Sequence, residues 1–248
     1  MTPPGTPPTQ PTGSPVGHPA TAVALVPAAG RGTRLGFGVP KALVPVRGTA
    51  LLTHAVRGLL DAGRVRHVVV AAPPAEVAAT AALLAEAGLA AEVVPGGADR
   101  TDSVRRALAH ALVVAPDARV VLVHDAARAF TPAAVINAVV DAVEAGAPAV
   151  IPVLPMADTV KQVDFAGTVL TTPDRAALRV VQTPQGFDVA TLTRAYAEAG
   201  DSATDDAGLV EKIGVPVATV PGHPYAMKVT TPFDLAIAES VLAAEELA

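Results

Sequence analysis

The chain has 248 residues, 51% of them hydrophobic, which is enough for one large domain with a sizeable core. A formal net charge of −5 and an aromatic content of 3% argue against a general nucleic-acid or membrane-surface role. The absence of cysteine excludes disulfides and thiolate metal sites, and no apolar run reaches the roughly 18 residues of a membrane-spanning helix.

Residues 1–20 are rich in proline, threonine and glycine, and they lack the charged start and apolar centre of a signal peptide. This composition predicts a disordered leader followed by one domain over residues 21–248. Because no export signal is visible, the expected location is the cytoplasm.

A short apolar run at 22–26 predicts a buried strand that ends at Pro27. The loop that follows is made of small residues and glycines and contains or precedes three cations: Ala28, Ala29, Gly30, Gly32, Gly36 and Gly38, with Arg31, Arg34 and Lys41. Backbone N–H groups of such a loop can surround phosphate oxygens. The combination predicts a nucleoside triphosphate site, and the alternative is a glycine-rich turn with solvated arginines.

Two other phosphate-binding loops are excluded. The chain has no GxxxxGK[ST] motif, and the spacing of Gly30, Gly32 and Gly36 is one residue off GxGxxG. The second predicted strand, 65–71, ends without the acidic residue that holds a ribose hydroxyl in dinucleotide folds. A dinucleotide-dependent oxidoreductase therefore does not fit.

Helices and strands then alternate, joined by short loops. The pattern predicts helices at 51–62, 75–87, 103–115 and 132–145, and strands at 65–71, 91–94, 120–123 and 149–153. Asp102 or Ser103 is expected to cap the third of these helices, and Thr131 the fourth. The alternation predicts an α/β fold with a Rossmann-like, mostly parallel sheet flanked by helices on both faces.

The alternation breaks after Pro155. Two β-like pieces at 159–163 and 168–171 predict a projecting β-arm at 155–176. The pattern resumes at Val180 with helices at 189–199 and 205–214, strands at 216–220 and 227–229, and a last helix from Pro232. Thr204 is expected to be the N-cap of the second of these helices.

Ligands bind beyond the carboxyl ends of strands in an open parallel sheet. Besides the first loop, the segments 96–103, 124–128 and 225–232 fall at such ends. In the first of them, the backbone around Gly97 and the hydroxyl of Ser103 could contact a base. The alternative is an ordinary helix cap.

Asp125 directly follows a buried strand, where a carboxylate can hold Mg²⁺ together with substrate phosphates. Arg128 could bind a phosphate, or it could form a structural pair with Asp125. His124 is expected to be packed or hydrogen-bonded rather than a metal ligand, and the histidine spacing favours no zinc site. Lys228 interrupts an apolar run, as a phosphate partner or on a solvated face.

The PAAGxGxR loop followed by PK is similar to the signature loop of sugar-phosphate nucleotidyltransferases. More specifically, the chain resembles the 2-C-methyl-D-erythritol 4-phosphate cytidylyltransferase family in eight segments spread over residues 21–246: PAAGRGTRLG…PK, GGADRTDSV, VHDAAR, DTVK, DR, QTPQGF, TDDA and KVTTPFDL. The resemblance implies that CTP and the methylerythritol phosphate give a CDP-alcohol and pyrophosphate, with Mg²⁺. The phosphate oxygen of the acceptor would attack the α-phosphorus in line.

The resemblance also implies roles for individual residues. Arg34 and Lys41 would stabilise the transition state, and Arg175 and Lys228 would position the acceptor phosphate. The CTP contacts fall on Pro27, Ala28, Ala29, Gly30, Gly32, Gly97, Asp99, Ser103 and Ala126. Asp125 would contact the metal and the acceptor, and further acceptor contacts fall on Arg128, Thr159 and Thr204. The family is a homodimer, so the arm would bring Thr159 and Arg175 into the partner's site.

Three positions depart from the family pattern: Ala226 stands for Asn, Ala129 for Pro and Gly208 for Ser. They put a second metal contact near 225–226 in doubt. Two alternatives remain, ribitol 5-phosphate cytidylyltransferase, which shares the CTP loops, and a catalytically inactive nucleotide-binding homologue. DTVK and QTPQGF favour the erythritol enzyme, and the presence of the expected catalytic residues counts against an inactive protein.

Overall fold

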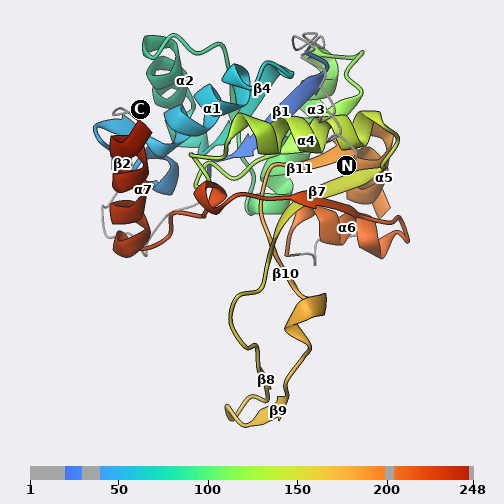
Figure 1. The fold of residues 1–248 in the computed structure, drawn as a ribbon. Helices are drawn as coiled ribbons and strands as arrows, with labels where there is room; N and C mark the ends of the chain where they lie inside the picture. The colour runs from blue at the N-terminus through green and yellow to red at the C-terminus, as the bar shows by residue number, and fades with distance from the viewer. Residues whose placement is uncertain (1–19, 30–39, 199–203, 246–248) are drawn as a thin grey trace, which may run out of the picture.

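The computed structural model describes residues 20–29, 40–198 and 204–245, with the fold drawn in Figure 1. Its centre is an eight-stranded sheet in the order β10-β7-β11-β6-β1-β4-β5, with β12 also paired to β7. The strands are β1 (Ala22–Pro27), β4 (Val65–Ala72), β5 (Glu92–Pro95), β6 (Val120–Val123), β7 (Ala149–Pro155), β10 (Arg179–Val181), β11 (Gln185–Asp188) and β12 (Ala218–Pro221).

The sheet is mixed but mostly parallel. β1 pairs in parallel with β4 and β6, β4 with β5, and β12 with β7. β11 runs antiparallel between β6 and β7, and β10 runs antiparallel to β7. The predicted α/β fold is confirmed, although sequence reasoning missed β11 as a strand.

Helices cover both faces of the sheet, as Figure 1 shows. One core joins alternate residues of β1, such as Ala24, to α1 (Leu51–Asp61), α2 (Val77–Glu86) and α4 (Ala133–Glu144). The other core joins the intervening residues, such as Leu25, to α3 (Arg100–Val114), α5 (Val189–Glu198) and α6 (Asp206–Lys212). Because both faces of β1 are buried, its sequence is an uninterrupted apolar run rather than an alternating one.

A smaller core lies beside the sheet. Here α7 (Pro232–Glu245) packs beside the short strands β2 (Pro45–Val46) and β3 (Thr49–Ala50). Val46, Val229 and Ala238 are buried together in this cluster. This packing holds the segment before α7 next to the start of α1.

An extension projects from the sheet between β7 and β10, and Figure 1 shows it reaching well away from the rest of the fold. At its far end, β8 (Gln162–Val163) and β9 (Val169–Thr171) form an antiparallel pair. The side chains of Val163, Phe165 and Leu170 are exposed there.

Two predicted helix caps on α3 and α6 are wrong. α3 begins at Arg100, because the side chain of Asp99 accepts the N–H of Asp102 at 2.8 Å. α6 is capped by Asp205, whose carboxylate accepts the N–H of Gly208 at 3.0 Å, and not by Thr204. Each helix starts where a neighbouring aspartate has the better position to accept an N–H three residues on.

Two further local predictions are corrected. α4 begins at Ala133 after Pro132, and the hydroxyl of Thr131 donates to the Arg128 carbonyl instead of capping the helix. The predicted strand at 227–229 is an irregular segment after the short 3₁₀ turn η5 (Pro224–Ala226).

Within the described ranges, no helix is both long and apolar enough to cross a bilayer.

Candidate functional site

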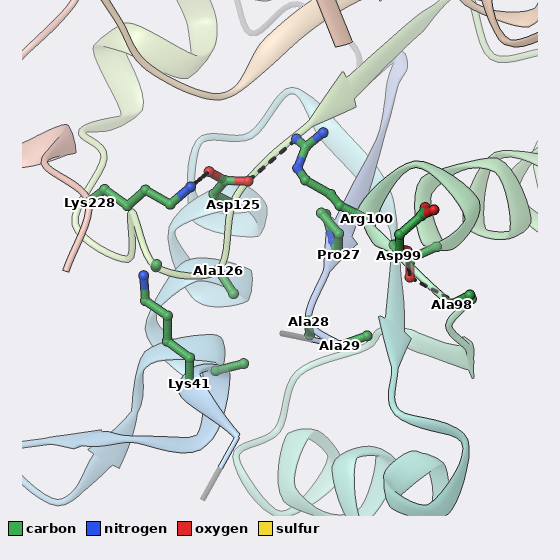
Figure 2. A pocket seen from close by; sticks show the side chains of 14 residues that line it. Pro27, Ala28, Ala29, Lys41, Ala98, Asp99, Arg100, Asp125, Ala126 and Lys228 are labelled. Carbon is green, nitrogen blue, oxygen red and sulfur yellow. Dashed lines mark hydrogen bonds and ion pairs between the residues drawn. The ribbon is translucent and has the colours of Figure 1, made fainter. Parts of the chain in front are cut away.

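A cavity of about 440 Å³ opens at the carboxyl ends of the central strands, and Figure 2 shows it from close by. Its walls come from segments far apart in the sequence: 27–29 at the end of β1, 41–42, 97–100 with Ser103 after β5, 125–127 after β6, and Lys228 before α7. The cavity therefore lies where ligands bind in open α/β sheets.

The cavity brings together most of the residues predicted from the sequence: Pro27, Ala28, Ala29, Lys41, Gly97, Asp99, Ser103, Asp125, Ala126 and Lys228. Arg128, Thr159, Arg175 and Thr204 are described by the structure but are not among its lining residues. Gly30, Gly32 and Arg34 lie outside the described residues, so their roles stay predictions.

One wall is the glycine loop before α3. The fully buried Ser103 hydroxyl accepts the Gly97 N–H at 3.0 Å and donates to the Asp99 carbonyl at 2.7 Å, which fixes the loop. A Cβ on Gly97 would lie 2.0 Å from a carboxylate oxygen of Asp102, so the close packing here requires glycine. That same carboxylate accepts the Ala98 N–H at 3.3 Å.

The facing wall is the end of β1. The Ala28 N–H donates to the Ala71 carbonyl at 2.8 Å, so the backbone continues the β1–β4 pairing past Pro27. A Cβ on Gly96 would lie 3.1 Å from the Ala29 side chain, which shows how closely the two loops approach. Small side chains on both walls leave a narrow space in which backbone groups can contact a flat ligand.

The charged part of the cavity is centred on Asp125. Its Oδ2 accepts a hydrogen bond from Lys228 Nζ at 2.7 Å, and its Oδ1 lies 3.4 Å from Arg100 Nη2. Figure 2 shows the Lys41 ammonium on the same side of the cavity as the Lys228–Asp125 pair. Two cationic side chains thus contact one carboxylate and a third cation, Lys41, lines the same cavity, an arrangement suited to binding a polyphosphate.

The Asp125 side chain is only 13% exposed. Burial by itself raises the pKa of this carboxyl group, but the charges of Arg100 and Lys228 outweigh burial and lower the pKa to about 2. Asp125 is therefore ionised at neutral pH, as a cation ligand must be.

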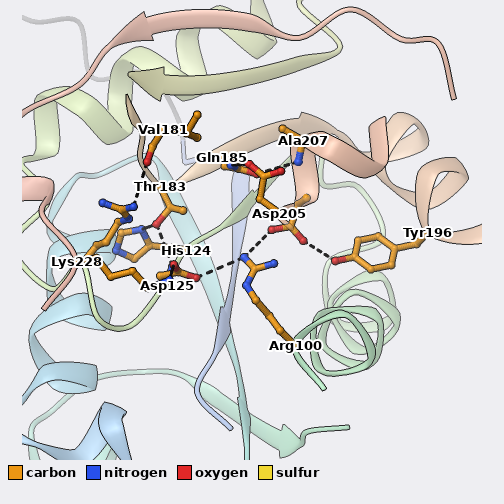
Figure 3. A network of polar contacts seen from close by, with 12 residues as sticks. Arg100, His124, Asp125, Val181, Thr183, Gln185, Tyr196, Asp205, Ala207 and Lys228 are labelled. Atoms are coloured by element: carbon orange, nitrogen blue, oxygen red, sulfur yellow. Dashed lines mark hydrogen bonds and ion pairs between the residues drawn. The ribbon is translucent and has the colours of Figure 1, made fainter. Parts of the chain in front are cut away.

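The backbone of Asp125 is fixed by a hydrogen bond within the polar network that Figure 3 shows. Its N–H donates to the Thr183 hydroxyl at 3.0 Å, and that hydroxyl is 3.0 Å from Nδ1 of His124. Burial lowers the pKa of His124 to about 4, so the ring is neutral at physiological pH. The prediction that His124 is packed and hydrogen-bonded is confirmed.

Arg128 ties three segments together. Its guanidinium donates to the Ala226 carbonyl at 2.7 Å and to the Val181 carbonyl at 3.1 Å. Burial lowers the pKa of Arg128, an effect that Asp125 partly offsets. In this arrangement the side chain supports the loops around the cavity, and its contact with an acceptor phosphate stays a prediction.

The remaining predicted residues lie elsewhere. Thr159 and Arg175 are exposed on the extension, where Arg175 donates to the Ala157 carbonyl at 2.8 Å. Figure 1 shows the extension pointing away from the rest of the chain. Thr204 is exposed just before α6. Contact of these residues with an acceptor in the same chain's cavity finds no support in this geometry.

Sequence reasoning missed Arg100 as a cavity residue. It lies in the GGADRTDSV segment at the first position of α3. Its place beyond the end of a predicted strand could have marked it as a candidate ligand-binding cation. Its nearest charged partner, Asp206, is 106 positions further along the chain, so no local spacing could reveal the pair.

Among the described residues, no group of three or more His, Cys, Asp or Glu side chains could hold a metal ion. Asp125 nevertheless fits Mg²⁺, which keeps several waters and uses one or two carboxylates together with substrate phosphates. An ionised, partly accessible carboxylate that lines the cavity meets that requirement.

Comparison with known proteins agrees with this geometry. The profile of the family described as "IspD: 2-C-methyl-D-erythritol 4-phosphate cytidylyltransferase" matches residues 22–244. A protein of that name from Saccharopolyspora erythraea is 71% identical over 90% of this chain and 100% of its own length. One from Nocardia farcinica is 57% identical over 90% of this chain and 94% of its own.

Among solved structures, the 2-C-methyl-D-erythritol 4-phosphate cytidylyltransferase of Thermus thermophilus superposes with a TM-score of 0.72 at 37% identity, covering 89% of this chain and 98% of that one. The sequence matches run over nearly the whole described fold, including every segment that lines the cavity. The chain belongs to the 2-C-methyl-D-erythritol 4-phosphate cytidylyltransferase family.

Proposed function

We propose that this protein transfers the cytidylyl group of CTP to 2-C-methyl-D-erythritol 4-phosphate, giving 4-diphosphocytidyl-2-C-methyl-D-erythritol and pyrophosphate. The observation that carries the proposal is the cavity itself, in which two glycine and alanine loops face a group of cations around Asp125. The 71% identity to a relative of that name supports the same reaction.

In the proposed complex, the base of CTP lies between the 28–29 backbone and the loop held by Ser103. Main-chain N–H and carbonyl groups can identify the edge of a base without moving, because the Ser103 hydrogen bonds already fix the loop. The triphosphate then extends toward Lys41, on the side of the cavity where the cations gather.

Attack of the acceptor phosphate on the α-phosphorus builds negative charge on the transferred group and on the leaving pyrophosphate. Lys41 is the described cation placed to stabilise that charge, and Arg34 is expected to act with it. Lys228, which pairs with Asp125, is placed to bind the acceptor phosphate instead once substrates enter. A divalent cation held by Asp125 would neutralise phosphate charge and orient the triphosphate.

The acceptor side of the site is proposed to be completed by a second copy of the chain. Arg175 and Thr159 lie on the extension and do not line the cavity of their own chain, and the tip of the extension exposes Val163, Phe165 and Leu170. Exposed apolar side chains on a protruding hairpin favour contact with another protein surface.

Mixed dimers test that arrangement. Arg175→Ala subunits and Lys41→Ala subunits are each expected to be nearly inactive alone. Mixing them under conditions that exchange subunits should restore part of the activity, because one site in each hybrid combines an intact cavity with an intact extension. Failure of the mixture to exceed its two components would argue against a shared site.

The reaction itself is tested by following pyrophosphate release from CTP with purified protein and a single polyol phosphate. Release with 2-C-methyl-D-erythritol 4-phosphate, and little with ribitol 5-phosphate, is the expected result. Preference for ribitol 5-phosphate would show that this compound is the acceptor instead. CTP binding without turnover of either acceptor would identify the protein as an inactive homologue.

A further inference from the structure

Arg100 lines the cavity and contacts two carboxylates at once, as Figure 3 shows. Its Nη2 donates to Oδ2 of Asp206 at 2.7 Å and lies 3.4 Å from Oδ1 of Asp125. The contact with Asp206 is a short charge-assisted hydrogen bond, whereas the contact with Asp125 is long. Arg100 is therefore bound mainly to the carboxylate outside the cavity lining.

Asp206 is held rigidly. It is 1% exposed, and its other oxygen accepts the hydroxyl of Tyr196 at 2.5 Å. The turn before it is fixed to β11, because Gln185 donates to the Asp205 carboxylate at 2.7 Å and accepts the Ala207 N–H at 2.9 Å. A buried carboxylate fixed on both sides is a stationary anchor for Arg100.

The protonation states keep this anchor intact. Burial and the neighbouring Asp206 charge both raise the pKa of Tyr196, so its hydroxyl stays a donor. Burial lowers the pKa of Arg100, but Asp206 and Asp125 outweigh it and the net shift is upward, so Arg100 stays charged.

Without the contact to Asp206, Arg100 would be free to pair with Asp125. A guanidinium can pair with a carboxylate through two parallel hydrogen bonds, and Asp125 is the other carboxylate within its reach. Such a pair would compete with Lys228, which holds Oδ2 of Asp125 at 2.7 Å, and even a single short bond from Arg100 would occupy Oδ1. Both oxygens would then be engaged by cations of the protein itself, so a metal ion would have to compete with them for Asp125.

We propose that Asp206, held by Tyr196, is a positioning residue that restrains Arg100 and thereby leaves one oxygen of Asp125 available to a divalent cation bound with the nucleotide. The inference rests on the proposed function, since it assumes that CTP and a divalent cation share this cavity. It assigns a role to the second aspartate of the TDDA segment, which does not line the cavity.

The experiment compares CTP affinity by calorimetry in EDTA and in saturating Mg²⁺, with no acceptor present. The factor by which Mg²⁺ tightens CTP binding is the measured quantity, because it reports the coupling between the two ligands. The proteins compared are the wild type, Asp206→Asn, and Asp206→Asn combined with Arg100→Gln. Asp141→Asn is the matched control, because it breaks an arginine–aspartate pair with Arg64 away from the cavity.

In Asp206→Asn, Arg100 turns to Asp125, and the Mg²⁺-dependent gain should fall by roughly fivefold or more. Adding Arg100→Gln removes the competing guanidinium and should return the gain toward the wild-type value, while Asp141→Asn should match the wild type. Recovery on a second substitution is a result that a purely structural role for Asp206 does not predict.

An unchanged gain in Asp206→Asn, or no recovery in the double variant, would overturn the inference while leaving the proposed function in place. A wild type that binds no CTP would overturn the proposed function itself. If Asp206→Asn does not fold, Arg100→Gln alone decides the question. The inference predicts a gain at least as large as the wild type's, and a lost gain contradicts it.

Discussion

Replacing Asp125 by asparagine tests whether the charges around the cavity are arranged as described. The substitution keeps the shape of the side chain and removes the charge that Lys228 and Arg100 surround at 2.7 and 3.4 Å. In the metal-free and nucleotide-free protein, these two cations then lose a partner that is only 13% exposed.

The magnitude follows from the pKa of Asp125, which the folded protein lowers from 3.8 to about 2. At about 1.4 kcal/mol per pKa unit, the ionised carboxylate contributes about 2 kcal/mol to the free energy of unfolding at pH 7. Because the folded pKa is the lower one, this contribution is complete above pH 3.8 and disappears as the pH falls through 2. At about pH 3, roughly half of it remains.

Urea unfolding followed by circular dichroism measures this contribution as the difference between wild type and Asp125→Asn. Both proteins are compared at one protein concentration, because an associating protein gains stability with concentration. The difference should be about 2 kcal/mol at pH 7 and roughly half that at pH 3. Asp61→Asn, which changes an exposed carboxylate at the end of α1, is the control and should shift stability by less than about 0.5 kcal/mol. Equal stability of the two proteins at pH 7, or a difference that does not shrink toward pH 3, would refute the reasoning.

Three further predictions concern other parts of the site. Lys41→Ala should lower kcat by roughly 10²-fold or more with a much smaller change in KM, as steady-state pyrophosphate release would show; an unchanged kcat would remove Lys41 from transition-state stabilisation. Gly97→Ala places a Cβ 2.0 Å from the Asp102 carboxylate and forces this loop to shift, so CTP binding measured by calorimetry should weaken; unaltered binding would show that this loop does not contact the nucleotide. Arg128→Gln removes hydrogen bonds to two backbone carbonyls and should lower the free energy of unfolding by about 1–3 kcal/mol; an inactive variant with unchanged stability would instead favour direct contact with the acceptor.

Much of the fold could be predicted because local patterns carry it. The uninterrupted apolar run of β1 and the regular alternation of helices and strands lead directly to a parallel sheet covered on both faces. β11 escaped prediction because its first residue, Gln185, is a buried polar side chain satisfied by the distant Asp205 and Ala207. Sequence patterns cannot show that distant segments supply the hydrogen-bond partners of such a residue.

The location of the site could be predicted from the order of strands and loops, but contacts between distant residues could not. The rule that ligands bind at the carboxyl ends of parallel strands is enough to bring the loops of Ala28, Gly97 and Asp125 into one cavity. The restraint on Arg100 could not be foreseen, because it depends on Asp206, 106 positions away and buried. Helix starts were misplaced where several residues near the start can accept a backbone N–H, since the choice among them depends on geometry.

The most direct test of the account is a structure of the protein with CTP and Mg²⁺. It should place the base against residues 28–29 and the loop of Gly97 and Ser103, with the triphosphate within hydrogen-bonding distance of Lys41 and the metal ion against Asp125. A nucleotide bound elsewhere on the chain, or bound in this cavity with its phosphates pointing away from Lys41 and Asp125, would contradict the account.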